Sequence, residues 1–520
     1  MAASFLFYGW TMRKFFKLIF SKFFIFSLIL LAEIGILVFF VLFLNSTIHS
    51  AIFTGITIAL DVIFVLYIIN SDINAEYKIA WIVPILFLPI LGCLFYIIFG
   101  RKRLSRFTRK KLTRNFRGVE CLYESRRGVL ERFEETDAFF ASCAKLISSE
   151  GYLPPTDCEE ALYFKVGEEY AEKLIEVLEG AKKYIFLEYF IIAEGKFWNR
   201  VLEILTEKAR EGVDVRVIYD DIGSIMTLPF YYPEKLKKLG IKCCCFNRYR
   251  PVLDVAQNNR THRKIAVIDG EYAFTGGINL ADEYVNEQAR FGHWKDTGIM
   301  LRGRAVQNFT TMFLQLWTVE FGNEKYGYEQ YLAEGGPGKY LCVPFGDSPY
   351  DSNRQICEDL YIKIIYNAKK YVYINTPYLI IDGEMKKALV SAAHSGVDVR
   401  ITVPHIPDKK YVFALTKAFY SPLVKEGVKI YQYTPGFIHA KSIVSDSRYA
   451  VIGSSNMDFR SFYLHFECDV LMYGEDFCKQ LRDDYLDTCK NSELITEDKI
   501  KIRLHSQIYR AALRIFAPLM

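Results

Sequence analysis

Two stretches of the chain share one spacing of polar residues. Residues 262–279 read HRKIAVIDGEYAFTGGIN, and residues 439–456 read HAKSIVSDSRYAVIGSSN. Both follow the pattern H-x-K, four residues, D, six residues, then G-[GS]-x-N. Because each of these residue types makes up only a small share of an average chain, the pattern rarely occurs even once by chance. Its double occurrence predicts two related domains.

The sequence around the two stretches repeats as well. AKKYIFLEYF begins at Ala181 and GVDVRVIYDD at Gly212, while AKKYVYINTPY begins at Ala368 and GVDVRITVPH at Gly396. Each copy contains an apolar β-rich run, a segment with apolar residues at helical spacing, and a second β-rich run, which is typical of β-α-β units. The stretch EGGPGK, residues 334–339, is the most linker-like segment between the copies. We therefore predict an α/β fold with two pseudo-symmetric α-β-α domains. Duplication for packing alone, without chemistry where the halves meet, is the alternative.

Three apolar segments precede these domains, at residues 23–44, 51–69 and 79–99. Each has close to the roughly 20 residues that a helix needs to cross a bilayer, and no secretory cleavage pattern accompanies them. Glu33 and Asp61 would be costly against lipid, so we expect them to face other helices or an interface. Packing of helices is a more economical explanation for both residues than ion transport.

The third segment contains Pro84 and Pro89, which helices in lipid tolerate when neighbours satisfy the freed carbonyl groups. It is followed by RKRLSRFTRKKLTRNFR at residues 101–117, and the positive-inside rule then predicts that the domains are cytoplasmic. Arg13, Lys14, Lys17 and Lys22 also favour the inside. Since three crossings cannot leave both ends on one side, either one segment is re-entrant or interfacial, or the weaker amino-terminal cluster is overridden.

The predicted domain organisation follows from these segments. It comprises a transmembrane region of two or three helices (1–100), a basic juxtamembrane linker (101–159), the first domain (160–333), the second domain (334–494) and an amphipathic tail (495–520). The tail is expected either to lie on the lipid surface or to pack on the two-domain part of the chain.

Charge and cysteine content add little to the choice of function. The net charge is +5, from 65 basic and 60 acidic residues, so attraction to an anionic partner must come from local clustering. The 12 cysteines show no C-x-x-C spacing, which predicts reduced thiols rather than a metal or redox site.

Alternation along a strand predicts which motif side chains act together. HRKIAVID and HAKSIVSD have the composition of strands, and side chains two residues apart on a strand share a face. His262 and Lys264 are therefore expected to point together, as are His439 and Lys441. Each half would offer one imidazole and one ammonium group.

The remaining motif residues have different expected roles. Asp269 and Asp446 lie an odd number of residues from the histidines, so alternation directs them to the opposite face and favours structural anchoring over catalysis. The glycines and Ser454 predict a tight turn that allows a close backbone approach and returns Asn279 or Asn456 to the histidine.

Two such half-sites facing each other would suit a phosphodiester. Both lysines and both asparagines can donate hydrogen bonds to phosphate oxygens, while one neutral imidazole attacks phosphorus and the other, protonated, supplies a proton to the leaving alkoxide. H-x-K is a poor metal-ligand spacing, and the lysines already supply positive charge, so neither a metal nor a cofactor is expected.

A nucleophilic imidazole is expected to have its other nitrogen held by a carboxylate. The candidates are Asp296, in HWKDTGIML, and Glu467, in LHFECDVLM, each at the start of a β-rich run after the asparagine turn. Ordinary surface carboxylates at strand starts are the alternative for both.

At this point the sequence resembles a known family. The paired motifs resemble those of the phospholipase D superfamily. RTHRKIAVIDGEYAFTGGINLADEY (260–284), HAKSIVSDSRYAVIGSSNMDFRSF (439–462), KIAWIVPILFLPILGCLFYIIFGRKR (78–103), YDDIGS (219–224) and the closing APLM are similar to those of bacterial cardiolipin synthases. The resemblance covers nearly the whole chain and implies two phospholipase D-like domains that form one site. Its departure from the usual two-span pattern is the extra apolar segment at the amino terminus.

The resemblance implies a role for each site residue. It implies a catalytic set of His262, Lys264, Asp269, His439, Lys441 and Asp446; phosphate binding by Asn279, Asn456 and Ser454; and orientation of the histidines by Asp296 and Glu467. By analogy with superfamily members, His262 is expected to attack, with His439 as general acid and then base.

The implied reaction transfers a phosphatidyl group between two phosphatidylglycerol molecules, giving cardiolipin and glycerol through a phosphohistidine. The implied location is the bacterial cell membrane, multi-pass, beside anionic lipid. A phospholipase D hydrolase or a phosphatidylserine synthase would use the same residues, and product analysis separates them. A nuclease is disfavoured because no long basic, aromatic-interleaved groove is evident and no nucleic-acid partner is expected. A catalytically dead membrane scaffold is disfavoured because both motifs are complete.

Overall fold

The computed structural model describes residue 35 and residues 47–100, 128–151, 153–249, 255–322, 328–333, 335–349, 355–500 and 504–519. Apart from residue 35, the first predicted apolar segment lies outside this part of the chain, as do Glu33 and the basic run at 101–117. The described elements divide into two compact units, an amino-terminal helical unit and a larger α/β unit that begins with α7.

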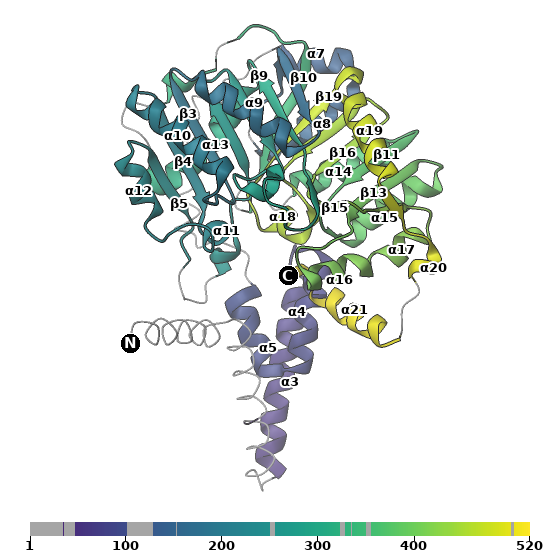
Figure 1. Ribbon diagram of the computed structural model, residues 1–520. Coiled ribbons are helices and arrows are strands. Elements are labelled where there is room, and N and C mark those ends of the chain that lie inside the picture. Colours follow the sequence, from purple (N-terminus) through teal and green to yellow (C-terminus); the bar gives the residue numbers. More distant parts are fainter. Residues whose placement is uncertain are drawn as a thin grey trace. The chain divides into compact units, whose positions relative to one another are not determined.

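The amino-terminal unit contains the second and third predicted apolar segments (Figure 1). Its elements are α3 (Thr47–Ile69), α4 (Ala75–Phe87), α5 (Pro89–Phe95) and the π-helical turn η1 (Tyr96–Gly100). Within the described chain, one stretch, Ala51–Ile69 of α3, is long and apolar enough to cross a membrane. Asp61 of α3 accepts a hydrogen bond from Cys93 Sγ of α5 at 3.8 Å, so it faces another helix as expected.

The third apolar segment is not the single helix that was predicted. It breaks at Leu88, and Pro89 opens the next helix. A Cβ on Gly92 would lie 2.5 Å from Ile85 Cα, so the two backbones touch and α5 folds back against α4. Pro84 lies inside α4, as a tolerated proline should, whereas Pro89 ends one helix and begins another because proline lacks an N–H and disfavours helix in the preceding residue.

Within the described residues, the α/β unit contains two large sheets of corresponding order and two two-stranded ones. The first has seven strands in the order β2-β9-β7-β6-β3-β4-β5, and the second has nine in the order β1-β10-β19-β17-β16-β11-β13-β14-β20. In both sheets the two β-α-β units supply parallel central strands, and the motif strand, β6 or β16, lies antiparallel beside them. The predicted α/β duplication is confirmed.

The elements of the first half have these bounds. Its strands are β2 (Glu160–Phe164), β3 (Tyr184–Tyr189), β4 (Asp214–Asp220), β5 (Lys242–Phe246), β6 (Lys264–Ile268), β7 (Tyr272–Gly276), β8 (His293–Lys295) and β9 (Gly298–Arg302). Its helices are α9 (Gly167–Glu179), α10 (Lys196–Arg210), α11 (Asp221–Ser224), α12 (Tyr232–Lys238) and α13 (Val306–Phe321), with 3₁₀ turns η3 (Val255–Asn258), η4 (Asp282–Val285) and η5 (Glu329–Tyr331).

The second half follows the same plan with additions at both edges. Its strands are β10 (Tyr340–Asp347), β11 (Tyr371–Asn375), β12 (Leu379–Ile380), β13 (Asp398–Pro404), β14 (Lys429–Tyr433), β15 (Gly436–Ile438), β16 (Ser442–Ser445), β17 (Tyr449–Gly453), β18 (Met457–Asp458), β19 (Glu467–Tyr473) and β20 (Ser492–Leu494). Its helices are α14 (Ile356–Asn367), α15 (Gly383–His394), α16 (Lys410–Ala418), α17 (Tyr420–Val424), α18 (Phe459–Tyr463), α19 (Glu475–Lys490), α20 (Glu497–Ile500) and α21 (Leu504–Phe516), with the 3₁₀ turn η6 (Ala517–Leu519).

Part of the predicted linker at residues 101–159 is folded. Its end forms α7 (Val129–Thr136), α8 (Ala138–Gly151) and β1 (Thr156–Cys158). β1 pairs antiparallel with β10 and so joins the sheet of the second half. Cys158 is fully buried, and Arg132 of α7 bonds the Asp157 carboxylate at 3.0 Å. The basic composition of 101–117 obscured these apolar helices further along the segment.

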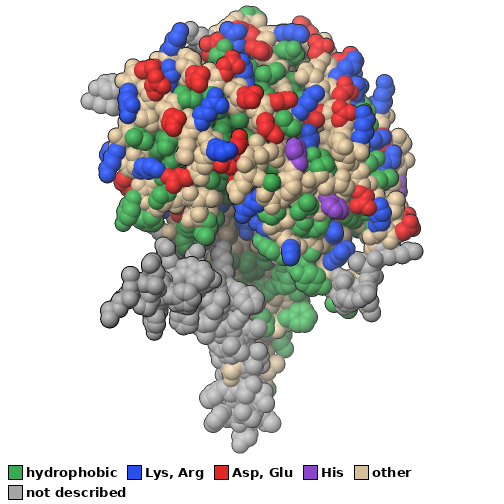
Figure 2. Space-filling view, viewed as in Figure 1, with side chains coloured by type: hydrophobic (Ala, Val, Ile, Leu, Met, Phe, Trp, Pro, Cys, Tyr) green, Lys and Arg blue, Asp and Glu red, His purple; other side chains and the backbone are tan. Residues whose placement is uncertain are grey.

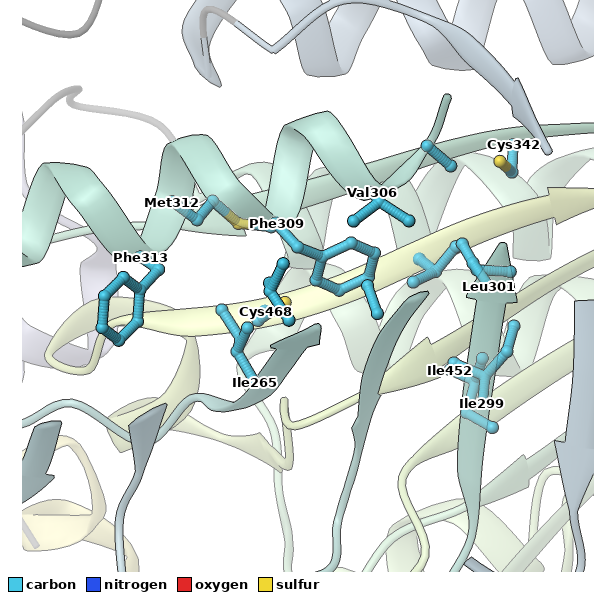
Figure 3. Close-up of a cluster of buried hydrophobic side chains, with 14 of the residues drawn as sticks. Ile265, Ile299, Leu301, Val306, Phe309, Met312, Phe313, Cys342, Ile452 and Cys468 are labelled. Atoms are coloured by element: carbon cyan, nitrogen blue, oxygen red, sulfur yellow. The ribbon is translucent and has the colours of Figure 1, made fainter. Parts of the chain in front are cut away.

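The two halves share one hydrophobic core. Helix α13 packs against strands of both sheets, and so does α19. Figure 3 shows Phe309 and Met312 of α13 beside Ile265 of the first sheet and Cys468 of the second, and all four are fully buried. Since each half buries apolar surface against the other, the halves are held as one body around their junction.

Candidate active site

Both histidine motifs lie at the carboxyl ends of the central parallel strands. Tyr189, the last residue of β3, pairs with Lys264 at the start of β6. Asn375, the last residue of β11, likewise pairs with Ser442, one residue after Lys441. The histidines precede these strands rather than lying within them. They sit where ligands usually bind in open α/β sheets.

Each histidine is bonded to a carboxylate of the other half. His262 Nδ1 lies 2.9 Å and 3.0 Å from the two carboxylate oxygens of Glu467. His439 Nδ1 lies 2.7 Å from Asp296 Oδ2. Both carboxylates are fully buried, and both imidazoles are 7% exposed. The sequence predicted these carboxylates as partners without indicating that the pairs would cross between the halves.

Short strand pairings hold the crossed arrangement. Thr261 bridges to Phe466, so the residues before His262 and Glu467 lie side by side, and the His262 N–H donates to the Phe466 carbonyl at 2.9 Å. In the other crossing, β8 pairs parallel with β15, and the His439 N–H donates to the carbonyl of Lys295 at 2.7 Å. Backbone hydrogen bonds therefore position both histidines independently of their side-chain hydrogen bonds.

The residue that packs against the carboxylate differs between the two crossed pairs: it is Gly277 beside Asp296 and Ser454 beside Glu467. Asp296 lies against Gly277, where an added Cβ would be 2.0 Å from Asp296 Oδ1. The corresponding Ser454 donates its hydroxyl to Glu467 at 2.5 Å and accepts from the Cys468 N–H at 2.9 Å. Ser454 was predicted to bind phosphate, but its fully buried hydroxyl is already used on the carboxylate. We interpret Ser454 as a positioning residue for Glu467, and its binding of phosphate stays a prediction.

The lysines are directed at the same point. Both are fully buried. Lys264 Nζ donates to the carbonyl of His262 at 2.6 Å, and Lys441 Nζ donates to the carbonyl of His439. An ammonium group has three N–H donors, so each retains two for a ligand.

The asparagines lie at the same strand ends. Leu280, next to Asn279, bridges to Ile192 just beyond β3, and β18, which follows Asn456, pairs with β12 just beyond β11. Asn279 Oδ1 accepts from the Ile191 N–H at 3.0 Å, while its buried amide nitrogen has no hydrogen-bond partner among the described residues. Asn456 Oδ1 is likewise without a partner in that part of the chain. Both amides thus retain hydrogen-bonding capacity.

The motif aspartates are absent from this cluster. Asp269 accepts hydrogen bonds from the backbone N–H groups of Lys182, Lys183 and Tyr184 at 2.7–2.8 Å. Asp446 makes the same three bonds at 2.7–2.9 Å to residues 369–371 of the second AKKY segment. Both lie beyond the far ends of β6 and β16. These hydrogen bonds agree with the expected structural anchoring, while the family-based place of both aspartates in the catalytic set stays a prediction.

Burial sets the protonation of the site. It lowers the pKa of His262 and of His439 well below the usual histidine value, and the neighbouring lysine charges act in the same direction. Burial also lowers the pKa of Lys264 to about 8 and of Lys441 to about 7. The unliganded site therefore favours neutral imidazoles, which is the form that can act as a nucleophile.

Burial acts on the carboxylates in the opposite direction. It raises the pKa of Glu467 to about 7 and of Asp296 to about 6, although the lysines oppose this shift. Each carboxylate accepts the Nδ1 proton of its histidine. That hydrogen bond leaves the Nε2 lone pair available for reaction.

A buried ion pair holds the segment before His262, and the sequence analysis gave it no role. Arg260 bonds the carboxylate of Asp220 at 2.8–3.0 Å, and Asp220 also accepts from the Thr261 N–H at 3.1 Å. Both residues were in stretches that carried the family resemblance, YDDIGS and RTHRK. We interpret them as positioning residues.

His465 was also missed. Its ring centroid is 5.5 Å from that of His262, and its buried Nδ1 makes no hydrogen bond within the described chain. His262, His465 and Glu467 offer ligand atoms within 4.8 Å of one another, which is close enough for a metal ion. An ion there would displace the hydrogen bond that orients His262. The absence of a metal requirement thus stays a prediction.

Family models match both parts of the chain. A model described as "Cardiolipin synthase, PLD-like domain" matches residues 174–317 and 361–487. A second, described as "Phospholipase_D-nuclease N-terminal", matches residues 59–101. The first model covers both motif-bearing halves, and the second covers α3 to η1.

Relatives are similar over most of their length. A protein of Streptococcus mutans described as uncharacterized is 41% identical over 88% of this chain and 99% of its own. A cardiolipin synthase of Alkalihalophilus pseudofirmus is 33% identical over 90% of this chain and 93% of its own. Cardiolipin synthase 2 of Bacillus anthracis is 34% identical over 85% and 86%, respectively.

A solved structure supports the fold. Phosphatidylserine synthase of Haemophilus influenzae superposes with a TM-score of 0.53 over 73% of this chain and 98% of its own, at 14% identity. At that identity the likeness concerns the fold alone. The family model over both halves and the relatives above show that the chain belongs to the cardiolipin synthase family of phospholipase D-like proteins.

Proposed function

We propose that the protein is a cardiolipin synthase, a phosphatidyltransferase that joins two phosphatidylglycerol molecules into cardiolipin and releases glycerol. The observation that carries this proposal is the pair of crossed histidine–carboxylate bonds, His262 with Glu467 and His439 with Asp296, each beside a buried lysine. Relatives described as cardiolipin synthases support the choice of substrate within the superfamily.

The first step forms a covalent intermediate. His262 Nε2 attacks phosphorus, and the bond from phosphorus to the glycerol oxygen breaks. Protonated His439 gives its proton to that oxygen, so glycerol leaves neutral. Although burial favours a neutral His439 in the free site, the bound phosphodiester anion favours the imidazolium form.

The second step reverses the proton movements. The glycerol hydroxyl of a second phosphatidylglycerol attacks the phosphohistidine, and neutral His439 takes its proton. The phosphorus–nitrogen bond breaks, which regenerates neutral His262 and releases cardiolipin. The overall transfer is reversible because one phosphodiester replaces another.

Lys264, Lys441 and Asn279 have donors available to stabilise the phosphate in both steps. Each lysine retains two N–H groups, and the amide nitrogen of Asn279 has no other partner among the described residues. At Asn456 the atom without a partner in that part of the chain is Oδ1, which accepts hydrogen bonds. Donors fixed before reaction stabilise the charge that develops on the phosphoryl oxygens. Glu467 stabilises the cationic His262 adduct, and Asp296 holds His439.

A hydrolase would use the same residues with water as acceptor and give phosphatidic acid. The crossed histidines do not select between the two acceptors, so exclusion of water decides the product. The apolar helix α3 and the matched amino-terminal family segment indicate association with a membrane, where water is scarce and lipid is concentrated. We further propose that the protein crosses the bacterial membrane more than once. By the positive-inside rule, its α/β unit, called the catalytic unit from here on, is cytoplasmic.

The test uses the full chain purified in detergent, with phosphatidylglycerol as the sole lipid and EDTA present. The expected products are cardiolipin and free glycerol in equal amounts. Phosphatidic acid as the main product would favour the hydrolase. Loss of activity in EDTA that added metal restores would contradict the metal-free mechanism.

Three histidine variants complete the test. His262→Ala and His439→Ala are expected to lose product formation by about 1,000-fold or more, because each removes a reacting group. His394→Ala is the matched control, since His394 is exposed and pairs with Glu426 at 2.9 Å on α15, outside the site. Activity surviving either motif substitution would contradict the shared site.

A further inference from the structure

An apolar rim surrounds the strand ends that carry the active site. We define the rim by six exposed side chains, three from each half: Met226 (78% exposed), Phe230 (76%), Tyr231 (70%), Tyr411 (52%), Ile508 (63%) and Tyr509 (53%). Figure 2 shows hydrophobic side chains along the lower margin of the catalytic unit, over the elements labelled α11, α16 and α21 in Figure 1. Large side chains this exposed, from separate elements, indicate an interaction surface.

The rim arises at equivalent places in the two halves. In the first half, α11 and the loop that follows it come directly after β4. In the second half, α16 comes after β13, the strand that corresponds to β4, and α21 packs against α16. Both groups therefore stand at the carboxyl edge of a sheet, where the histidines lie.

The first-half part of the rim is attached directly to the site. Thr227 Oγ1 donates to the Ile192 carbonyl at 2.6 Å, and a Cβ on Gly223 would lie 2.1 Å from the Phe190 carbonyl oxygen. The ring of Phe190 in turn lies 5.1 Å from that of His262. The loop that carries the first-half rim residues is therefore anchored to the segment after β3, where Phe190 lies beside the proposed nucleophile.

The second-half part is attached in a corresponding way. The Leu379 N–H of β12 donates to Thr416 Oγ1 of α16 at 3.3 Å, and β12 pairs with β18, which follows Asn456. Arg510 of α21 donates to the Lys417 carbonyl of α16 at 3.4 Å. The tail helix therefore packs on the second half and also presents apolar side chains outward, while its contact with a lipid surface stays a prediction.

The charged side chains near the rim indicate which kind of partner it binds. Residues 222–233 contain no charged side chain, and neither α16 nor α21 contains an acidic one. Exposed Lys409 and Lys410 begin α16, and exposed Arg514 lies near the end of α21. The first-half segment is uncharged between Asp221 and Glu234, and the second-half helices carry basic side chains. Together with the exposed apolar side chains, these features match the headgroup region of an anionic bilayer, where the chains insert and the cations meet phosphates.

We propose that this rim enters the surface of an anionic phospholipid bilayer and so delivers lipid phosphates to the site without withdrawing the lipids from the membrane. The proposal rests on the proposed function and adds to it a docking surface on the catalytic unit itself. Two phosphatidylglycerol molecules could then approach from one surface, one beside each half.

The test compares two physical forms of the substrate with the full chain. Two triple variants remove the rim, Met226→Ser/Phe230→Ser/Tyr231→Ser and Tyr411→Ser/Ile508→Ser/Tyr509→Ser. Each is expected to raise the KM for long-chain phosphatidylglycerol in mixed micelles, measured against its surface mole fraction, by about tenfold. The kcat/KM for monomeric short-chain phosphatidylglycerol should stay within about twofold, since the rim does not touch the reacting atoms.

Tyr366→Ser is the matched control. Tyr366 is 51% exposed, like Tyr411, but lies at the end of α14, before β11 begins, and so at the opposite edge of the sheet. It should change neither constant. Equal losses for both substrate forms would mean that the rim variants damage the fold or site, and unchanged micellar KM values would mean that the rim is not used. Either result overturns the proposal.

A second measurement separates the rim from the proposed reaction. The wild-type chain is placed in nanodiscs with an anionic lipid that carries a photoreactive acyl chain, and cross-linked peptides are mapped by mass spectrometry. Adducts are expected at 226–231, 411 and 508–509, and not at 366. This result holds even if the lipid product is not cardiolipin, whereas an absence of adducts at the rim would refute the docking surface while leaving the enzymatic activity intact.

Discussion

At the scale of single residues, the close approach of Gly277 to Asp296 gives a sharp test of the crossed site. A methyl group at Gly277 would lie 2.0 Å from Asp296 Oδ1, so Gly277→Ala must push the carboxylate away from His439. We expect kcat to fall by about 100-fold or more with little change in the unfolding temperature. The measurement is a pair of assays on one preparation, turnover of phosphatidylglycerol and thermal unfolding.

Gly180→Ala is the control for that substitution. Gly180 ends α9 with an ordinary φ of −80°, and its Cβ would meet the Val177 carbonyl oxygen at an acceptable 3.5 Å. It should leave both readouts near wild type. Full activity in Gly277→Ala would show that Asp296 does not have to hold His439.

The buried lysines predict how activity depends on pH. Because burial lowers the pKa of Lys441 to about 7 and of Lys264 to about 8, the free site loses ammonium charge as the pH rises through this range. The value of kcat/KM should therefore fall above pH 7 to 8. The corresponding fall in kcat should come at higher pH, since a bound phosphate anion favours the charged lysines.

The acid side of the same profile reports the proposed nucleophile. Burial and the lysine charges lower the pKa of His262, so the loss of kcat/KM from protonating it should lie well below the usual histidine value of about 6.5. Because His439 must be protonated to act as the acid, its lowered pKa adds to the fall of kcat/KM on the alkaline side. The measurement is kcat and kcat/KM from pH 5 to 10 at constant ionic strength. A kcat/KM that stays flat between pH 7 and 10 would contradict the assigned lysine role.

Sequence reasoning at this scale identified the reacting groups but not their pairing. The spacing of H-x-K located His262 and His439, and strand starts located Asp296 and Glu467. It did not show that the bonds cross, because His262 and Glu467 are 205 residues apart and His439 and Asp296 are 143 apart. Contacts of that kind depend on how the halves dock, and local periodicity does not encode docking.

At the scale of secondary-structure elements, Asp269 fastens β6 to the start of β3. It receives three backbone hydrogen bonds, including one from Tyr184 at 2.8 Å, and has a φ of 56°. Asp269→Ala is expected to lower the free energy of unfolding by about 3 kcal/mol, because it leaves these N–H groups without their acceptor. Thermal unfolding in detergent is the measurement.

Two comparisons separate anchoring from catalysis. Asp269→Asn should lose less stability, since its amide oxygen still accepts and asparagine tolerates positive φ. His262→Ala should keep the unfolding temperature and lose activity. An Asp269→Ala chain of wild-type stability without activity would restore this aspartate to the catalytic set.

The repeated AKKY segments illustrate what patterns at this scale convey. They were recognised as a repeat, and the structure gives the reason for their duplication: their backbone N–H groups receive Asp269 and Asp446. The β-α-β unit and the motif strand of each half followed from periodicity. The break at Leu88 and the strand β1 did not, because they depend on the packing of α5 against α4 and of β1 against β10.

At the scale of the whole molecule, the duplicated halves act as one enzyme because neither site is complete alone. Each half contributes one imidazole and the carboxylate for the other imidazole. The shared core around α13 and α19 fixes their separation. Gene duplication accounts for the near-identical surroundings of His262 and His439, although one is proposed to be the nucleophile and the other the acid.

The covalent intermediate tests this shared site most directly. The full chain is incubated with phosphatidylglycerol, quenched under conditions that preserve phosphorus–nitrogen bonds, digested and analysed by mass spectrometry. We predict one phosphatidyl adduct per chain, on His262, absent in His262→Ala and retained in the control His394→Ala. Continued cardiolipin formation without an adduct on either motif histidine would contradict the phosphohistidine mechanism and, with it, the proposed division of labour between the two halves.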